Sequence, residues 1–137
     1  MKVTAKWIDK LAFDAISDNG HIIRTDTTAA GGSLDSGMSP KKLMLASLAG
    51  CSGIDVVDIL MKMRVPYTRL EIDAEAEQTD TDPKVFKSIQ MIYRADVSAD
   101  NLDKLERAVH LSHDKYCGVS AMLKKHCEIT YEIELIK

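Results

Sequence analysis

Two of the three cysteines lie in sequence contexts that suit thiol chemistry. Cys51 lies in the middle of an apolar run, and Cys117 stands at the expected start of a short helix, where N-terminal N–H groups lower the pKa of a thiol. A thiolate is nucleophilic and can be oxidised to a sulfenic acid or a disulfide. A cysteine in an apolar helix is also a common space-filling residue. The long separation in sequence does not show whether the two thiols meet.

The histidines suggest a different chemistry. His110 and His113 are three residues apart, Cys117 follows four residues later, and His126 and Cys127 are adjacent. Spacing of this kind can hold zinc. Since nothing in the sequence brings these side chains together, we predict no metal site, and a zinc-dependent fold stays an alternative hypothesis. We expect Cys127 to be a structural or half-exposed thiol at the start of a strand.

The composition is that of an ordinary soluble globular domain, with 45% hydrophobic and 28% charged residues among 137. The net charge of −3 argues against nucleic acid as a partner, and no polybasic segment favours an anionic membrane. Residues 1–7 lack the apolar run of a signal peptide, so we expect a cytoplasmic protein. In that reducing compartment, cysteines are more often free, metal-bound or catalytic than joined in structural disulfides.

A long helix must carry Cys51. Ser39 can cap its first turn, Pro40 suits the first helical position, and Pro66 marks the stop after about Met63. The charges of Asp55 and other polar residues argue against a membrane span, so we expect a helix buried on all sides. One subunit of this size offers too little cover for such a helix. An intertwined dimer would supply the rest.

Alternating apolar and polar residues predict strands on both sides of this helix. Before it, we expect strands over 3–7, 11–15 and 21–25, a turn at Asp18-Asn19-Gly20, and a mobile loop from Thr25 to Met38. After it, we expect strands at Leu70–Gln78, 89–97 and Cys127–Ile136, with helices at Asp100–Ser112 and Cys117–Lys125. We find no linker or repeat, so residues 1–137 are predicted to form a single α+β domain.

Two motifs resemble those of the OsmC/Ohr family, the osmotically inducible proteins C and organic hydroperoxide resistance proteins. The run from Ser39 to Cys51 (SPKKLMLASLAGC) is similar to the motif that opens the family's long helix, and Tyr116–Ser120 resembles its Cys-Pro-Val-Ser segment. The order of elements agrees over essentially the whole chain, and Cys51–Val57 suggests the OsmC-like branch. The resemblance implies an intertwined homodimer whose long central helix packs between antiparallel sheets.

The resemblance also implies an activity, the reduction of organic or hydrogen peroxide in oxidative stress defence. The Cys51 thiolate would attack the peroxide and become a sulfenic acid, which Cys117 would resolve as a disulfide. A small thiol, or a dithiol of the lipoyl type, would reduce that disulfide. No metal, haem or flavin is implied.

In the family an N-terminal arginine supports the reactive cysteine, and Arg24 is the matching candidate, because it is the only arginine before Cys51. The glutamate that orients this arginine in the family is replaced by Lys41, and the second motif's proline by Gly118. Lys41 would change the electrostatics, another carboxylate would orient Arg24, or activity would be weak. An OsmC-like binding or structural protein without efficient turnover is therefore the second hypothesis. Asp55 lies one turn beyond Cys51, where capping or a dimer contact is the simpler role.

Overall fold

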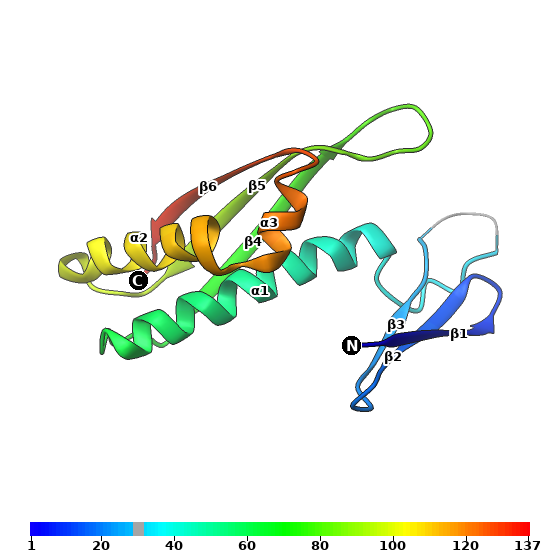
Figure 1. The fold of residues 1–137 in the computed structure, drawn as a ribbon, viewed down its shortest axis with the longest axis horizontal. Coiled ribbons are helices and arrows are strands. Elements are labelled where there is room, and N and C mark those ends of the chain that lie inside the picture. Colours follow the sequence, from blue (N-terminus) through cyan, green and yellow to red (C-terminus); the bar gives the residue numbers. More distant parts are fainter. Residues whose placement is uncertain (29–31) are drawn as a thin grey trace. The chain divides into compact units, whose positions relative to one another are not determined.

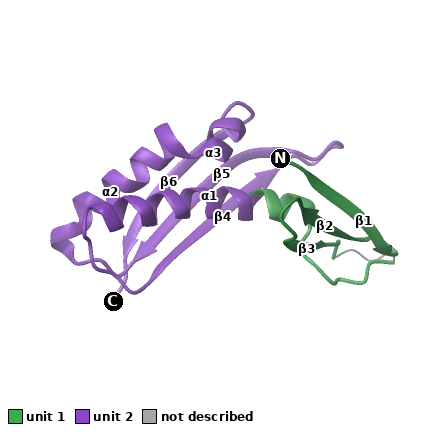
Figure 2. Cartoon of the chain, turned by 60° about the horizontal axis from the view of Figure 1, so that its bottom comes forward, with its two compact units in different colours: residues 1–44 green, residues 45–137 purple. Residues whose placement is uncertain are grey.

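The computed structural model describes residues 1–28 and 32–137, which form two compact units, residues 1–44 and 45–137 (Figure 2). The long helix begins in the first unit and continues through the second. The predicted loop from Thr25 to Met38 includes residues 29–31, which lie outside the described residues. Each unit is described by itself below.

The first unit is a three-stranded antiparallel sheet in the order β1–β2–β3 (Figure 1). Its strands are β1 (Val3–Asp9), β2 (Ala12–Ser17) and β3 (Ile22–Thr25), as the alternation predicted. The turn between β2 and β3 contains Gly20 at a φ of 91°, a left-handed conformation that glycine adopts without a steric penalty. The register places Trp7 opposite Phe13 and Ala15 opposite Ile23, so one face of this sheet is apolar.

The long helix, α1 (Pro40–Lys62), begins at the predicted proline. It ends where Arg64 adopts a φ of 57° and the Val65 N–H donates to the Leu60 carbonyl at 3.0 Å, as in a Schellman motif. Its buried residues recur every four positions in one stripe: Leu48, Ser52, Val56 and Leu60. The expectation of burial on all sides is therefore wrong for the chain alone, because side chains such as Ile54 and Met61 lie exposed.

The second unit contains a sheet in the order β4–β5–β6, formed by β4 (Leu70–Gln78), β5 (Phe86–Ala95) and β6 (Glu128–Leu135). We expected antiparallel sheets, but this one is mixed, since β5 and β6 run parallel. A parallel pair requires a crossover connection. Here the crossover is made of a short 3-10 turn (Ala99–Asn101), α2 (Leu102–Leu111), a π-helical turn (Ser112–Tyr116) and α3 (Gly118–Leu123).

The hydrophobic core lies in this second unit and joins α1, β5 and α2 through residues such as Val56, Tyr93 and Leu105. At Gly53, α1 approaches β4 so closely that an added Cβ would lie 3.2 Å from Ile72 Cδ1. By length and composition, one helix of the described residues, α1, could cross a membrane. Its buried stripe packs instead in this core, as expected for the central helix of a soluble domain.

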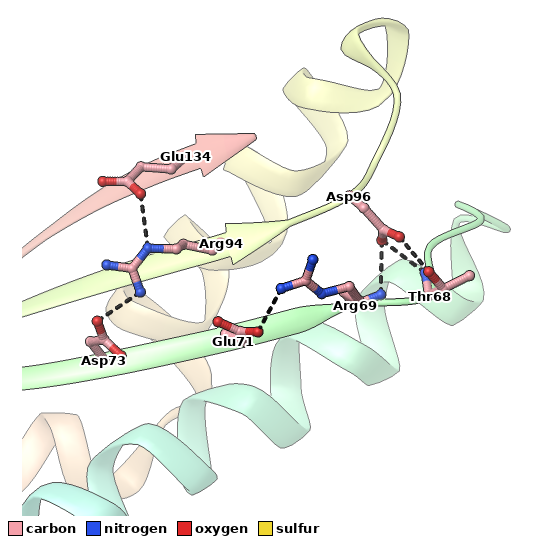
Figure 3. Close-up of polar contacts among 7 residues, drawn as sticks. All are labelled: Thr68, Arg69, Glu71, Asp73, Arg94, Asp96 and Glu134. Atoms are coloured by element: carbon pink, nitrogen blue, oxygen red, sulfur yellow. Dashed lines mark hydrogen bonds and ion pairs between the residues drawn. The ribbon is translucent and has the colours of Figure 1, made fainter. Parts of the chain in front are cut away.

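Polar contacts tie the three strands together (Figure 3). Arg94 on β5 donates to Asp73 on β4 at 2.7 Å and to Glu134 on β6 at 2.9 Å. At the end of β5, Asp96 accepts hydrogen bonds from the Thr68 hydroxyl and from the backbone N–H groups of Thr68 and Arg69. These bonds hold the pKa of Asp96 at about 2, below its usual 3.8.

Candidate functional site

The two predicted thiols meet in the second unit. Cys51 is half-buried on α1, and Cys117 is buried between the π-helical turn and α3. The Cys117 N–H donates to the Ser112 carbonyl at 2.8 Å, and the Ser120 N–H donates to Cys117 Sγ at 3.3 Å. The Cys51 side chain is close enough to Cys117 to help raise the pKa of the Cys117 thiol. The fold therefore brings together two cysteines that lie far apart in the sequence.

Burial decides the protonation of Cys117. Together with smaller contributions from the neighbouring Cys51 and Asp55, and against the opposing Ser120 N–H, it raises the pKa of this thiol to about 11. The sequence-based prediction that the helix N-terminus lowers this pKa is therefore wrong in direction, because the side chain is only 3% exposed and α3 has only six residues. At neutral pH Cys117 therefore keeps its proton.

A chain of hydroxyl groups runs beside the thiol pair. Ser112 Oγ donates to the Asp55 carboxylate at 2.9 Å and lies 3.0 Å from Ser52 Oγ. Ser52 Oγ in turn lies 2.6 Å from the Tyr93 hydroxyl. Ser52, Ser112 and Tyr93 are buried, so this network extends from the hydrophobic core at β5 to the half-buried Asp55. A satisfied network of this kind fixes the positions of its members more firmly than isolated bonds would.

The tyrosine of this network is held in its neutral form. Burial, opposed by the hydrogen bond with Ser52 and aided by smaller contributions from nearby Cys117 and Asp55, raises the pKa of Tyr93 to about 12. Sequence analysis missed Tyr93, Ser52 and Ser112, and it favoured capping or a dimer contact for Asp55. The available signals were weak: Ser52 follows Cys51 directly, and Tyr93 is a hydroxyl-bearing residue on an otherwise apolar strand face.

Arg24 lies on β3 in the first unit, where it pairs with Asp14 on β2 through its Nε and, at 3.2 Å, its Nη2. The hydrogen bond from Arg24 holds the pKa of Asp14 below its usual value. The structure thus places a carboxylate, that of Asp14, beside the Arg24 guanidinium. The contact of Arg24 with the thiols stays a prediction.

The zinc hypothesis gains no geometric support. Among residues 1–28 and 32–137, no group of three or more His, Cys, Asp or Glu side chains is placed to hold a metal ion. His110 pairs with Asp114, and the His113 ring contacts the ring of Tyr131. His126 Nε2 lies 2.9 Å from the Phe86 carbonyl oxygen. His110 and His113 share Tyr131 as a neighbour, because His110 Nδ1 lies 3.4 Å from the Tyr131 hydroxyl, whereas His126 contacts a different residue.

The fold and the thiol pair define an α+β protein of the OsmC/Ohr type, as the motifs predicted. The chain belongs to the OsmC-like protein family, whose model matches residues 31–132.

Among its relatives, protein YhfA of Escherichia coli strain K12 is 36% identical over 99% of this chain and 98% of its own length. The crystal structure of a hypothetical protein from Aquifex aeolicus VF5 is 29% identical, with a TM-score of 0.79 over 99% of this chain and 97% of that one. The organic hydroperoxide resistance protein OhrB of Bacillus subtilis shares the fold, with 19% identity and a TM-score of 0.65 over 97% and 96% of the two chains.

Proposed function

We propose that this chain is a thiol-dependent hydroperoxide reductase that consumes organic or hydrogen peroxide in oxidative stress defence. The observation that carries the proposal is the proximity of Cys51 to Cys117, whose thiol pKa is raised to about 11 by burial and, to a smaller extent, by Cys51. The fold is shared with a protein named for organic hydroperoxide resistance, which supports the same chemistry.

In the first step, the Cys51 thiolate attacks the terminal oxygen of the hydroperoxide. A sulfur–oxygen bond forms and the oxygen–oxygen bond breaks, so the sulfur loses two electrons and becomes a sulfenic acid. The alkoxide leaves with those two electrons and takes a proton to become an alcohol, or water when the substrate is hydrogen peroxide. The Cys117 S–H beside the reacting sulfur is a hydrogen-bond donor at this stage.

In the second step, the Cys117 sulfur attacks the sulfenic sulfur of Cys51. The disulfide bond forms, and the hydroxyl group leaves as water with the proton of Cys117. An external thiol, or a dithiol of the lipoyl type, then supplies two electrons and two protons that restore both thiols. The cycle as proposed uses no metal or bound organic cofactor.

Arg24 is proposed as the cation that stabilises the Cys51 thiolate, with Asp14 in the orienting role that the family gives to a glutamate. Its guanidinium is held from one side by Asp14 and lies 3.5 Å from Ser36 Oγ. In this proposal Lys41, at the position of the family's glutamate, is not needed to orient Arg24.

The working form is proposed to be a cytoplasmic homodimer. The exposed side chains on the apolar face of the first sheet include Trp7, Phe13 and Ile23, and those on α1 include Ile54 and Met61. Exposed apolar surface of this extent is typical of an interface. A second copy of the chain would cover it.

The test is consumption of cumene hydroperoxide and hydrogen peroxide by purified protein with dithiothreitol. Cys51→Ser should abolish turnover. Cys117→Ser should still react once and leave a sulfenic acid that dimedone traps on Cys51. Cys127→Ser is the matched control, because Cys127 is the third cysteine and belongs to neither motif, and it should keep turnover near the wild-type rate.

If the wild-type chain stays fully reduced in the presence of both peroxides, the enzymatic proposal fails and a binding or structural role replaces it. If Cys127→Ser loses turnover as completely as Cys51→Ser does, the assignment of the reactive pair is wrong.

A further inference from the structure

Ser112 is the first residue of the π-helical turn that leads to Cys117. Its backbone carbonyl accepts the Cys117 N–H at 2.8 Å, and this bond closes the turn. Its side chain binds the long helix, because Oγ donates to the Asp55 carboxylate at 2.9 Å and lies 3.0 Å from Ser52 Oγ. Ser112 is fully buried. One residue therefore connects the helix that carries Cys51 to the backbone of Cys117.

The partners of Ser112 on α1 lie beside Cys51 in the chain. Ser52 follows Cys51 directly, and Asp55 lies one helical turn beyond it. Because Ser112 gives its proton to Asp55, Ser52 must donate to Ser112, and the Tyr93 hydroxyl donates to Ser52. Three hydroxyl protons thus point the same way along the network, toward a charged acceptor, and such an arrangement strengthens each bond.

The turn that Ser112 begins is of an unusual kind. The Cys117 N–H reaches back five residues to Ser112, whereas in an α-helix it would reach back four, to the carbonyl of His113. That carbonyl instead accepts a hydrogen bond from the Lys124 ammonium at 2.5 Å. A π-helical turn is rare, is often found at functional sites, and changes the direction in which the next residue points. The contacts of Ser112 with α1 hold this turn, and so fix where Cys117 lies.

We propose that Ser112, held by Asp55 and Ser52, positions Cys117 for its attack on Cys51, so that this network sets the rate of disulfide formation. The inference rests on the proposed function and deepens it by naming the residues that control its second step. The first step needs the Cys51 sulfur, whereas the second needs two sulfurs from separate elements to meet in one geometry. The three network residues act through the backbone of the turn and are positioning residues.

Dithiodipyridine, an uncharged aromatic disulfide, tests the second step without peroxide. In a Cys127→Ser background, the Cys51 thiolate attacks the reagent, forms a mixed disulfide and releases one thiopyridone. The Cys117 sulfur then displaces the second thiopyridone, which leaves with the proton of Cys117 as the protein disulfide forms. Ser112→Ala should leave the first release within about twofold of the wild-type rate and slow the second at least about tenfold. Ser88→Ala, the same change at a half-buried position of β5, is the matched control and should alter neither.

Variants of the acceptor show whether Ser112 acts through Asp55. Asp55→Ala removes the acceptor and should slow the second release as Ser112→Ala does. Asp55→Asn keeps a side-chain oxygen that can accept the same proton, so it should restore the second release to within about threefold of wild type. Asp58→Ala is the control on the same helix, because its carboxylate binds Lys62 instead. The double variant Ser112→Ala/Asp55→Ala should be no slower than the single variants, since all remove one bond. A second release that Asp55→Ala changes no more than Asp58→Ala does would overturn the inference.

The two assays separate this inference from the proposed function. With peroxide, Ser112→Ala should form the Cys51 sulfenic acid at the wild-type rate and accumulate it, as dimedone labelling measures. A wild-type chain that consumes no peroxide, but whose second thiopyridone release depends on Ser112, would refute the peroxidase proposal and support the positioning role. If both releases in Ser112→Ala match wild type, or if both slow equally, the positioning role is wrong and the peroxidase proposal stands.

Discussion

The two units of the chain are built by different means. In residues 45–137 the sheet and helices share a core in which Leu60, Tyr93 and Leu105 are fully buried. In residues 1–28 and 32–44, the buried residues are Ala12 and Asp26, and large side chains such as Trp7 lie exposed. The first unit is held mainly by strand hydrogen bonds and by polar contacts of Arg24 and Asp26.

This difference separates two tasks. The second unit can desolvate a thiol, because a dry core is what raises the pKa of Cys117. The first unit presents a cation at its surface and leaves an apolar face without cover. The comparison predicts that substitutions in the second unit act on folding, while matched substitutions in the first act on association.

The largest expected effect is on the core. Leu60→Ala should lower the free energy of unfolding by about 2–5 kcal/mol, because it removes a fully buried side chain and leaves a cavity. Ile22→Ala in the exposed part of β3 should change it by less than about 0.5 kcal/mol. Urea denaturation at low protein concentration measures both. Similar values for the two variants would break the contrast between the units.

The next effect concerns self-association. Ile23→Asp places a carboxylate on the apolar face of the first sheet and should weaken dimer formation at least about hundredfold, because the charge would be buried without a partner. Sedimentation equilibrium at micromolar concentration measures the mass. Ile22→Asp, on the opposite face of the same strand, is the control and should have a much smaller effect. A variant at Ile23 that remains dimeric would exclude this face as the interface.

A smaller effect is expected at the buried hydroxyl network. Tyr93→Phe removes one of the two hydroxyl partners of Ser52 and should cost about 1–2 kcal/mol of unfolding free energy. Tyr116→Phe makes the same chemical change at an exposed position and should be nearly neutral. Thermal denaturation compares the two directly. A neutral Tyr93→Phe would show that the network contributes little to the second unit.

The smallest effect on stability is expected at acidic pH, where the two units should again respond differently. Hydrogen bonds led by the Thr68 hydroxyl hold the pKa of Asp96 at about 2, against 3.8 unperturbed. Its stabilising contribution is therefore complete above about pH 4 and is lost as the pH falls through 2. Asp96→Asn should flatten the pH dependence of global unfolding between pH 4 and 2.

Asp26 in the first unit provides the comparison. Burial opposes its ionisation, but hydrogen bonds from Ser36, Thr27 and Ser33 outweigh that cost and hold its pKa at about 2 as well. Asp26→Asn should alter hydrogen exchange in residues 25–28 and 32–38 over the same pH range and leave global unfolding almost unchanged. An equal effect of both substitutions on global unfolding would mean that the two units unfold as one.

Much of the fold could be predicted because its signals are local. Alternation and the turn at Asp18-Asn19-Gly20 located the six strands of the described residues, and the proline at position 40 located the start of α1. The parallel pairing of β6 could not be read from its own residues, because alternation is the same for either direction. The pairing of Asp14 with Arg24 could have been predicted from the sequence, since the turn at Asp18-Asn19-Gly20 sets the register that places them opposite each other.

The candidate site was less predictable because its properties depend on distant residues. The motifs identified Cys51 and Cys117, yet the raised pKa of Cys117 follows from burial that the helix-start rule does not include. Ser52, Ser112 and Tyr93 come from three separate elements and meet only in the folded core. A single sequence contains no local signal for such a convergence.

The crossover that makes β6 parallel to β5 also sets an order of assembly. Cys51 lies on a continuous helix whose backbone hydrogen bonds are local, and helix formation is among the fastest steps of folding. Cys117 lies inside the crossover, which reaches its place only when β6 docks on β5 across a long stretch of chain. In a newly made chain, before the crossover has docked, the proposed reactive cysteine, Cys51, would lack Cys117, the proposed resolving cysteine. If such a chain reacts with peroxide, Cys51 cannot form the disulfide, so we expect overoxidation to be fastest during folding.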